Sequence, residues 1–249
     1  MNNNVALIPA RSGSKRVINK NISQLEGHPL IAYSITSALN SNQFDDVIVS
    51  TDSQEIKEVS EYYGASVPFL RPEEYSQDKS PDIEWVKHSL NYLSKYKEYE
   101  VFSILRPTSP FRKPETIKRA LKLFLQKECD SLRAVEKCLQ HPCKMWEISD
   151  DYMTPFVNLN EKGPKNQPLH SSQYPSLPEV YVQNASLEIA YVKTVYDFNN
   201  ISGEKIIPFI TERDEGFDVN VKDDWELAKI LIKNGEASLP NIKKKAYSK

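Results

Sequence analysis

Three short apolar runs alternate with segments of helical spacing in the first half of the chain, and this alternation limits the possible fold more than any other feature. Residues 5–8, 47–49 and 101–105 have the length and composition of strands that are buried on both faces of a sheet. After each run, apolar residues recur every three or four positions, at 31–39, 56–59, 83–93 and 114–124. Strands that alternate with crossover helices form a mostly parallel sheet with helices on both faces. We therefore predict an α/β fold whose ligand lies at the carboxyl ends of the strands.

The composition excludes several functional classes. Of the 249 residues, 39% are hydrophobic and 27% are charged, as in an ordinary globular protein. The 32 basic and 34 acidic residues nearly cancel, so no nucleic-acid partner is expected, because non-specific binding needs a strong positive field. No apolar run approaches the roughly 18 residues of a membrane span, and the first residues do not form a secretory signal. We expect a cytoplasmic protein without a membrane partner, in which Cys129, Cys138 and Cys143 stay reduced because they lack C-x-x-C spacing.

The second half of the chain departs from this alternation. A long polar stretch with several prolines, residues 158–179, separates short strand-like segments. We predict an α/β core formed by residues 1–139 and 192–249, and an excursion over residues 140–191 that forms a small lobe or a dimerisation arm. The terminal sequence KKKAYSK is expected to be a frayed basic tail.

The loop after the first predicted strand carries the sequence R-S-G-S-K, from Arg11 to Lys15. Its spacing is neither that of a P-loop nor that of a dinucleotide-binding motif. Gly13 permits a backbone that points N–H groups inward, and Ser12 and Ser14 add hydroxyl donors. Arg11 and Lys15 supply charge that matches a triphosphate. The loop is therefore predicted to bind phosphate, with a solvated surface loop as the alternative.

A second polar loop, R-P-T-S-P-F-R, follows the predicted strand at 101–105. Its two prolines fix the backbone, so Thr108 and Ser109 are held rigidly between Arg106 and Arg112. This arrangement suits an anionic substrate. A plain strand-to-helix connection would explain the prolines equally well, although not two arginines around two hydroxyl groups.

A third candidate lies near the carboxyl end of the chain. In the sequence D-V-N-V, a strand with period two would place Asp218 and Asn220 on one face, and Val219 and Val221 on the other. A carboxylate and an amide oxygen at the mouth of a sheet suit Mg²⁺, which completes its coordination with water and phosphate oxygens. The alternative is an exposed strand residue at 218, followed by a helix cap at Asp223.

Together these motifs resemble the CMP-sugar synthetases of the acylneuraminate cytidylyltransferase type. The resemblance covers essentially the whole chain and rests on the sequences IPARSGSKRVINKNI, FDDVIVSTDSQEI, LRPEEYSQDKS, LRPTSPFR, QHPCKMW and FDVNVKDDWELA. It implies a Rossmann-like sheet with an excursion that exchanges contacts across a homodimer. It also implies a reaction in which CTP and a 2-keto sugar acid, such as a nonulosonate, give a CMP-sugar and pyrophosphate.

The resemblance carries over to particular residues. Arg11, Ser14, Lys15 and Asn21 match the nucleotide loop of the family, and Lys20 is its second lysine. Further nucleotide contacts are expected at Arg71 and Ser80, and Asp218 matches the first carboxylate that binds Mg²⁺. Catalytic roles are accordingly predicted for Arg11, Lys15 and Asp218.

The acceptor half of the sequence departs from the sialic acid type. Asn220 stands where a second aspartate is frequent, and Arg106 stands where glutamine is frequent. Val182 and Gln183 precede Asn184 where the sialic acid enzymes have an arginine. We therefore predict that recognition of the acceptor carboxylate has moved to Arg106, in an acceptor site formed by Arg106, Thr108, Ser109, Lys144, Gln183 and Asn184. The alternative is that Arg106 only pairs with a nearby acid of the fold.

Two other functions remain open on the sequence. A nucleotidyltransferase for another sugar or a sugar phosphate would need a second site for a dianion, and no further basic cluster is present. A non-catalytic nucleotide-binding homologue is suggested by Asn220, although the other motif residues are intact. His141, which precedes a proline, is predicted to be a structural turn residue rather than a catalytic base.

Overall fold

The computed structural model describes residues 3–13, 17–157 and 162–248. The chain forms two compact units, of which the first comprises Met1–Ala134 and Asn184–Lys249, and the second comprises Val135–Gln183. Because the relative placement of the units is not determined, each is described by itself.

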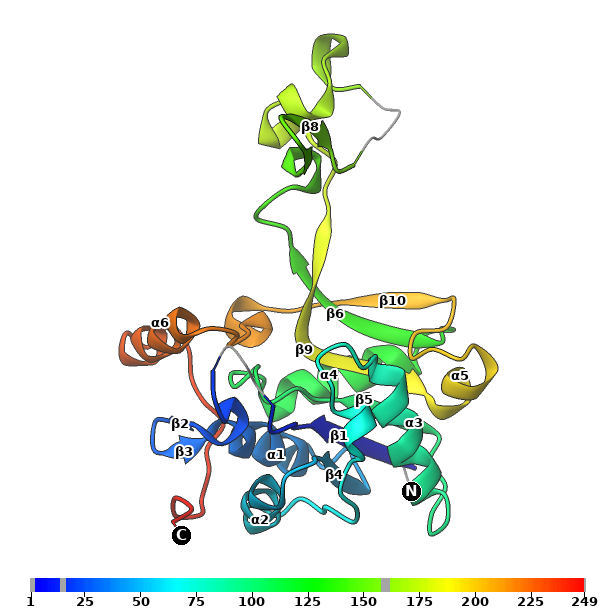
Figure 1. Ribbon diagram of the computed structural model, residues 1–249, viewed down its shortest axis with the longest axis vertical. Coiled ribbons are helices and arrows are strands. Elements are labelled where there is room, and N and C mark those ends of the chain that lie inside the picture. Colours follow the sequence, from blue (N-terminus) through cyan, green and yellow to red (C-terminus); the bar gives the residue numbers. More distant parts are fainter. Residues whose placement is uncertain (1–2, 14–16, 158–161, 249) are drawn as a thin grey trace. The chain divides into compact units, whose positions relative to one another are not determined.

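The first unit is built on a six-stranded sheet in the order β10-β6-β9-β5-β1-β4 (Figure 1). Strand β1 is parallel to both of its neighbours, β4 and β5, whereas β9 is antiparallel to β5. The sheet is therefore mixed, and the predicted parallel part lies around β1. The strands are β1 (Asn4–Pro9), β4 (Asp46–Ser50), β5 (Val101–Ile104), β6 (Ser131–Lys137), β9 (Tyr181–Tyr191) and β10 (Ile206–Ile210).

Helices cover both faces of this sheet, as the sequence predicts (Figure 1). Alternate residues of β1 belong to different apolar clusters: Ala6 and Ile8 pack with α1, α2 and α4, whereas Val5 and Leu7 pack with α3 and α5. All four side chains are fully buried, and burial of each of the larger ones stabilises the fold by about 1.5–3 kcal/mol. The helices are α1 (Leu30–Ser41), α2 (Gln54–Tyr63), α3 (Asp82–Leu93), α4 (Pro114–Leu125) and α5 (Val192–Asp197).

Helix α6 (Lys222–Lys233) packs on a third apolar cluster, which includes Trp225 and Val219. The Asp224 carboxylate accepts hydrogen bonds from the backbone N–H groups of Asn220 and Val221, at 2.7 and 2.9 Å, and so satisfies the start of the helix. The prediction of a strand before this helix is wrong, because residues 217–220 are extended but pair with no strand among the described residues. Alternation of polar and apolar residues does not distinguish a sheet strand from a single extended segment.

The prediction of a frayed basic tail is also wrong. The Tyr247 N–H donates to the Tyr63 hydroxyl at 3.1 Å, and the Tyr62 hydroxyl donates to the Lys245 carbonyl at 3.1 Å. The Lys244 ammonium donates to the Tyr62 carbonyl, and the ring of Tyr247 packs edge-on against the ring of Tyr62. The tail is held because two tyrosines at the end of α2 offer both hydrogen bonds and apolar surface.

Short elements connect these strands and helices. They are β2 (Gln24–Leu25), β3 (His28–Pro29), and the 3-10 turns η1 (Lys20–Ile22), η2 (Glu73–Tyr75) and η7 (Arg213–Gly216). The second unit contains the hairpin β7 (Trp146–Ser149) and β8 (Tyr152–Pro155), and the 3-10 turns η3 (Pro142–Lys144), η4 (Pro164–Asn166), η5 (Leu169–Ser171) and η6 (Tyr174–Ser176). Among the described residues, no helix has both the length and the apolar character to span a membrane.

His141 is the structural turn residue that the sequence predicts. Its Nδ1 accepts a hydrogen bond from the Cys143 N–H at 3.1 Å, and its Nε2 therefore carries the proton donated to the Pro178 carbonyl at 2.8 Å. All three cysteines are free, and Cys129 and Cys143 are buried.

Candidate active site

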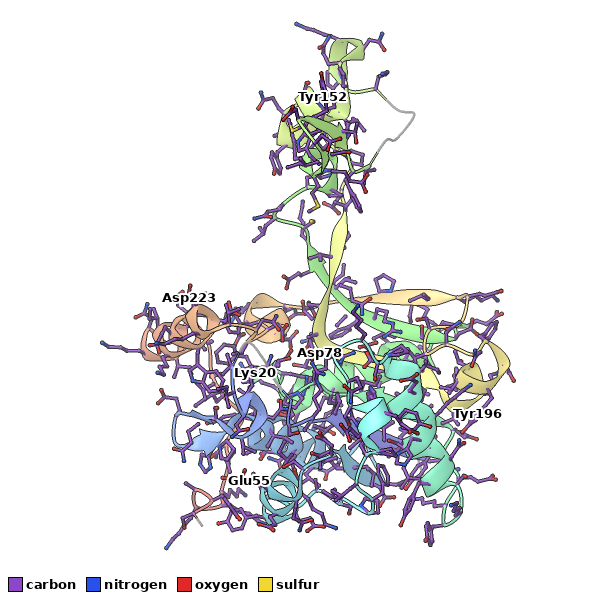
Figure 2. The ribbon with its side chains drawn as sticks, viewed as in Figure 1. Lys20, Glu55, Asp78, Tyr152, Tyr196 and Asp223 are labelled. Atoms are coloured by element: carbon purple, nitrogen blue, oxygen red, sulfur yellow. The ribbon has the colours of Figure 1, made fainter. Side chains whose placement is uncertain are left out.

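A cavity of about 530 Å³ lies in the first unit, where loops that follow β1 and β5 come together. This is the edge at which α/β sheets bind ligands. The residues that line it come from four of the motifs that the sequence singled out and from α3, and none comes from the motif at residues 44–56: Pro9, Arg11, Lys20, Asn21, Arg71, Tyr75, Gln77, Asp78, Ser80, Asp82, Trp85, Arg106, Pro107, Thr108 and Asn220. Two of them, Lys20 and Asp78, are labelled in Figure 2.

Arg11 reaches the cavity from the loop after β1. Its Nη1 donates to the Ser76 carbonyl at 3.2 Å, and its Nη2 forms an ion pair with the Asp78 carboxylate at 2.8 Å. The next residue, Ser12, donates to the Asp52 carboxylate through both its N–H and its hydroxyl, each at 2.8 Å. Both polar groups of Ser12 are thus engaged within the protein.

Two of the predicted phosphate-binding residues, Ser14 and Lys15, lie outside the described residues. Gly13 precedes them with a φ outside the left-handed region, so the backbone conformation seen here does not by itself require glycine.

Asn21 and Lys20 anchor the far end of the same loop. The Asn21 side-chain amide donates to the Arg11 carbonyl at 3.1 Å, which closes the loop on itself. Asn19, in the left-handed conformation with φ 53°, turns the chain into η1. The Lys20 ammonium donates to the Val219 carbonyl at 3.0 Å, so the loop after β1 is joined to the segment before α6.

Arg71 is a buried cation in the cavity wall, with 6% of its surface exposed. Its Nε donates to the Ser50 hydroxyl at 3.0 Å and its Nη2 to the Ser50 carbonyl at 2.7 Å, while the guanidinium lies 5.0 Å from the centre of the Trp85 ring. Burial lowers the pKa of Arg71 to about 10, so it stays protonated at neutral pH. Ser80 lies nearby in the lining and donates its hydroxyl to the Glu74 carbonyl at 2.8 Å.

Arg106 also lines the cavity, and it is paired with two acids. Its Nη2 donates to the Asp82 carboxylate at 2.5 Å and to the Glu188 carboxylate at 2.8 Å. Glu188 in turn forms an ion pair with the guanidinium of Arg133. Burial alone would raise the pKa of Asp82, but the charge and hydrogen bond of Arg106, the hydrogen bond of Trp85 and the charge of Arg71 together outweigh it and lower that pKa, so the carboxyl group is ionised at neutral pH.

The sequence interpretation missed both acids that pair with Arg106. Asp82 opens α3, where an acid is explained by the helix dipole alone. Glu188 carried a clearer signal, because a charged residue between Leu187 and Ile189 of a buried strand needs an opposite charge.

The remainder of the loop after β5 is supported from behind. Thr108 lines the cavity, and its carbonyl accepts a hydrogen bond from the Val219 N–H at 2.8 Å. The buried guanidinium of Arg112 donates to the Arg106 carbonyl, to the Ser186 carbonyl and to the Ser34 hydroxyl. Ser109 is buried and does not line the cavity, and its hydroxyl has no hydrogen-bond partner within the described part of the chain.

The segment before α6 contains a carboxylate oxygen that can accept a cation. Asn220 donates its amide N–H to Oδ2 of Asp218 at 2.5 Å, while Oδ1 of Asp218 is buried without a hydrogen-bond partner among the described residues. Those residues contain no group of three or more His, Cys, Asp or Glu side chains that could hold a metal ion. Asn220 lines the cavity, whereas Asp218 does not. One carboxylate oxygen without a hydrogen-bond partner suits an ion such as Mg²⁺, which can take a single protein carboxylate and complete its coordination with water and phosphate oxygens.

The remaining predicted acceptor residues are divided between the two units. Lys144 and Gln183 belong to the second unit, where the Lys144 ammonium donates to the carbonyls of His170 and Ser172, each at 2.7 Å. Asn184 belongs to the first unit and donates its amide N–H to the Thr211 hydroxyl at 2.9 Å. Of the four predicted acceptor residues in the first unit, Arg106 and Thr108 line this cavity, whereas Ser109 and Asn184 do not.

Two solved structures have a similar fold. Superposition on CMP:2-keto-3-deoxy-manno-octonic acid synthetase complexed with CTP gives a TM-score of 0.65 at 12% identity, over 93% of this chain and 99% of that one. Superposition on 4-diphosphocytidyl-2C-methyl-D-erythritol synthase from Anaerococcus prevotii gives 0.61 at 14% identity, over 92% and 98%. At such identities the likeness concerns the fold alone.

Curated proteins are similar in sequence. N-acylneuraminate cytidylyltransferase from Escherichia coli O18:K1:H7 is 36% identical over 226 residues, which cover 90% of this chain and 51% of that protein. CMP-N,N'-diacetyllegionaminic acid synthase from Legionella pneumophila is 33% identical over 244 residues, covering 94% and 98%. Pseudaminic acid cytidylyltransferase from Campylobacter jejuni is 32% identical over 234 residues, covering 92% and 96%. The chain thus spans about half the length of the first relative and nearly all of the other two.

Residues 5–162, which include the loops after β1 and β5, match the protein family described as cytidylyltransferase. This match and the similarity to the Legionella and Campylobacter proteins along almost their whole length lead to one conclusion. The chain belongs to the cytidylyltransferase family.

Proposed function

We propose that the protein transfers CMP from CTP to the anomeric hydroxyl of a sialic-acid-like 2-keto sugar acid, a nonulosonate, and releases pyrophosphate. The observation that carries this proposal is a single cavity that receives cationic side chains from four different parts of the chain, namely Arg11, Lys20, Arg71 and Arg106. Both substrates are anions, so a site that holds them together needs distributed positive charge. The names of the three similar proteins, which refer to N-acylneuraminate, diacetyllegionaminic acid and pseudaminic acid, support this substrate class.

The nucleotide would lie along Arg11, Lys20 and Asn21. Lys15, two positions after Gly13, would contribute a further positive charge. Arg11 and its partner Asp78 both line the cavity. Arg71 and Ser80 are proposed to contact the nucleoside end, because Arg71 is fixed by Ser50 and presents a rigid donor rather than a mobile one.

Catalysis would depend mainly on positioning and on electrostatic stabilisation, because the anomeric oxygen must approach the α-phosphorus in line with the departing pyrophosphate. Arg11 and Lys15 would stabilise the negative charge that moves onto the leaving group. Asp218, assisted by Asn220, would hold Mg²⁺, which when bound supplies positive charge to the phosphate oxygens.

The acceptor would lie on the other side of the cavity, toward Arg106 and Thr108. A guanidinium binds a carboxylate through two parallel hydrogen bonds, a geometry that glutamine cannot reproduce. Ser109, Asn184, Gln183 and Lys144 remain proposed acceptor residues. Of these, Ser109 has a buried hydroxyl next to Thr108 that lacks a partner among the described residues.

A homodimer is proposed on the surface chemistry of the second unit. Its apolar side chains are unusually exposed: Leu139 by 89%, Ile148 by 78%, Tyr152 by 81% and Phe156 by 59%. Several large apolar side chains exposed on one small unit are typical of a surface that another protein chain covers. Light scattering at several concentrations tests the assembly, and a monomer at all of them would refute it.

Pyrophosphate release tests the function directly. The protein is assayed with CTP and a panel of N-acetylneuraminic, legionaminic, pseudaminic and 3-deoxy-manno-octulosonic acids, with sugar phosphates and with the other nucleoside triphosphates as controls. We expect release with CTP and at least one nonulosonate. Release with a sugar phosphate but no sugar acid would favour another nucleotidyltransferase, and CTP binding without turnover would favour a non-catalytic homologue.

A further inference from the structure

One nitrogen of Arg106 is shared by two carboxylates. Nη2 lies 2.5 Å from Oδ2 of Asp82 and 2.8 Å from Oε1 of Glu188. Together with Arg133, which pairs with Glu188, these side chains form a group of two cations and two anions with no net charge. A carboxylate brought by a substrate therefore meets an arginine whose charge is already balanced.

The two acids are held very differently. The side chain of Glu188 is 7% exposed, and its second carboxylate oxygen is bound by Arg133, which also donates to the Ile201 carbonyl and the Ser202 hydroxyl. Glu188 does not line the cavity and has no room to leave its position.

Asp82 has the opposite character. Its side chain is 33% exposed and lines the cavity, and its other oxygen accepts a hydrogen bond from the Trp85 indole at 2.7 Å. It stands at the beginning of α3, directly after Pro81, so its carboxylate can turn away from Arg106 and still face water. Of the two acids on Nη2, only Asp82 occupies space that a ligand in the cavity can take.

We propose that Asp82 occupies, in the unliganded protein, the position on Arg106 that the carboxylate of the acceptor takes during the reaction, and is thereby a specificity-determining residue for the acceptor. This inference rests on the proposed function. Glu188 is the positioning residue of the two acids. It keeps the Arg106 guanidinium directed at the cavity while the acceptor carboxylate replaces Asp82 on the side that faces the cavity. An acceptor carboxylate must bind Arg106 more strongly than Asp82 does in order to displace it. Carboxylates that bind weakly are therefore excluded.

The test compares two isosteric variants that each remove one negative charge from the same arginine. In Asp82→Asn the competing negative charge is lost, while the amide oxygen can still accept the hydrogen bond from Trp85. We expect the KM for the sugar acid to fall by about threefold to tenfold, because a negative charge that repels the acceptor carboxylate is removed from a partly exposed site. The KM for CTP should change less than twofold. In Glu188→Gln the guanidinium is no longer fixed, and the sugar-acid KM should rise.

A double-mutant cycle with Arg106→Gln shows whether Asp82 acts through Arg106. If it does, Asp82→Asn no longer lowers the sugar-acid KM when Arg106 is absent. An undiminished effect in the double variant would overturn the inference, as would an unchanged or higher sugar-acid KM in Asp82→Asn alone. Thermal unfolding of each variant separates these outcomes from misfolding of Glu188→Gln, and the Asp82 result decides the inference without that variant.

The same measurements separate the inference from the function on which it rests. A wild-type protein that releases no pyrophosphate with any sugar acid refutes the proposed function and the inference with it. An active wild-type protein whose sugar-acid KM is unaffected by Asp82→Asn refutes the inference alone.

Discussion

Replacement of Asp78 by asparagine should tighten the binding of CTP. The Asp78 carboxylate lies 2.8 Å from Nη2 of Arg11, and both residues line the cavity. If Arg11 binds the triphosphate, a phosphate oxygen must compete with Asp78 for the same guanidinium. Asp78→Asn removes the competing charge at nearly constant shape.

The size of this effect follows from the exposure of the pair. The side chains of Arg11 and Asp78 are 34% and 39% exposed, so solvent screens their attraction and the pair contributes a few tenths to about 1 kcal/mol. A competitor of that strength changes a dissociation constant by about twofold to fivefold. The gain should shrink as salt is added, because screening weakens the competition in the wild-type protein.

Isothermal titration of CTP without the sugar acid measures the change. Glu128→Gln is a matched control, since it removes one acid of equal charge from an exposed pair with Lys205, at 2.6 Å, outside the cavity. We expect CTP to bind more tightly to Asp78→Asn than to the wild-type protein. The affinity of the control variant for CTP should be unchanged. Equal or weaker binding in Asp78→Asn would show that Asp78 is not a competitor, and would refute the assignment of Arg11 to the phosphates.

Three further predictions concern charge at other positions. Asp218→Asn should reduce Mg²⁺-dependent turnover by 100-fold or more, because about 3 kcal/mol of electrostatic stabilisation is lost. Asn220→Asp should be tolerated. Turnover that survives EDTA would contradict both expectations. Lys15→Ala should cost about 2–4 kcal/mol of transition-state stabilisation in kcat/KM without a change in Tm, and near-normal turnover would exclude the residue. Burial alone would raise the pKa of Glu215, but hydrogen bonds from Arg119, Thr116 and the Glu212 N–H, with the charge of Arg119, together lower it below its usual 4.5. The stability that Glu215 adds at neutral pH is therefore lost as pH falls through the folded-state pKa. Denaturant unfolding at pH 3 to 7 should therefore show a weaker acid dependence in Glu215→Gln, and an unchanged profile would refute this.

The core of the fold could be predicted because its pattern is local. Residues 5–8 form an unbroken apolar run, and such a run is stable only where both faces of a strand are covered. Ile117, Leu121 and Phe124 recur at helical spacing and are all buried along α4. In both cases the residues that decide the structure are neighbours in the sequence.

The errors arose where distant contacts decide the structure. Val219 alternates with polar residues as in a strand, but its N–H is bonded to Thr108, more than a hundred positions away, and not to a neighbouring strand. Tyr247 lies in a lysine-rich tail, yet it is held by Tyr63 at the end of α2. No local pattern reports such partners.

The candidate site shows the same division. The loop positions of Arg11, Arg106 and Asn220 follow from the order of strands and helices, and all three line the cavity. The acids that pair with the two arginines are Asp78, Asp82 and Glu188, which lie between 24 and 82 positions from their partners. The sequence therefore indicates which cations face the cavity, but not how far their charge is already balanced.

The backbone of Val219 has a consequence for protein engineering. Its carbonyl accepts from Lys20 of the nucleotide loop, and its N–H donates to Thr108 of the loop after β5, so one peptide segment fixes the spacing of both. A graft that exchanges residues 106–109 for those of a relative changes one end of this connection and leaves the other end in place. Acceptor preference should therefore transfer between relatives only when the nucleotide loop, residues 106–109 and the segment around Val219 are exchanged together. Proline should be avoided at position 219, because it has no N–H to donate.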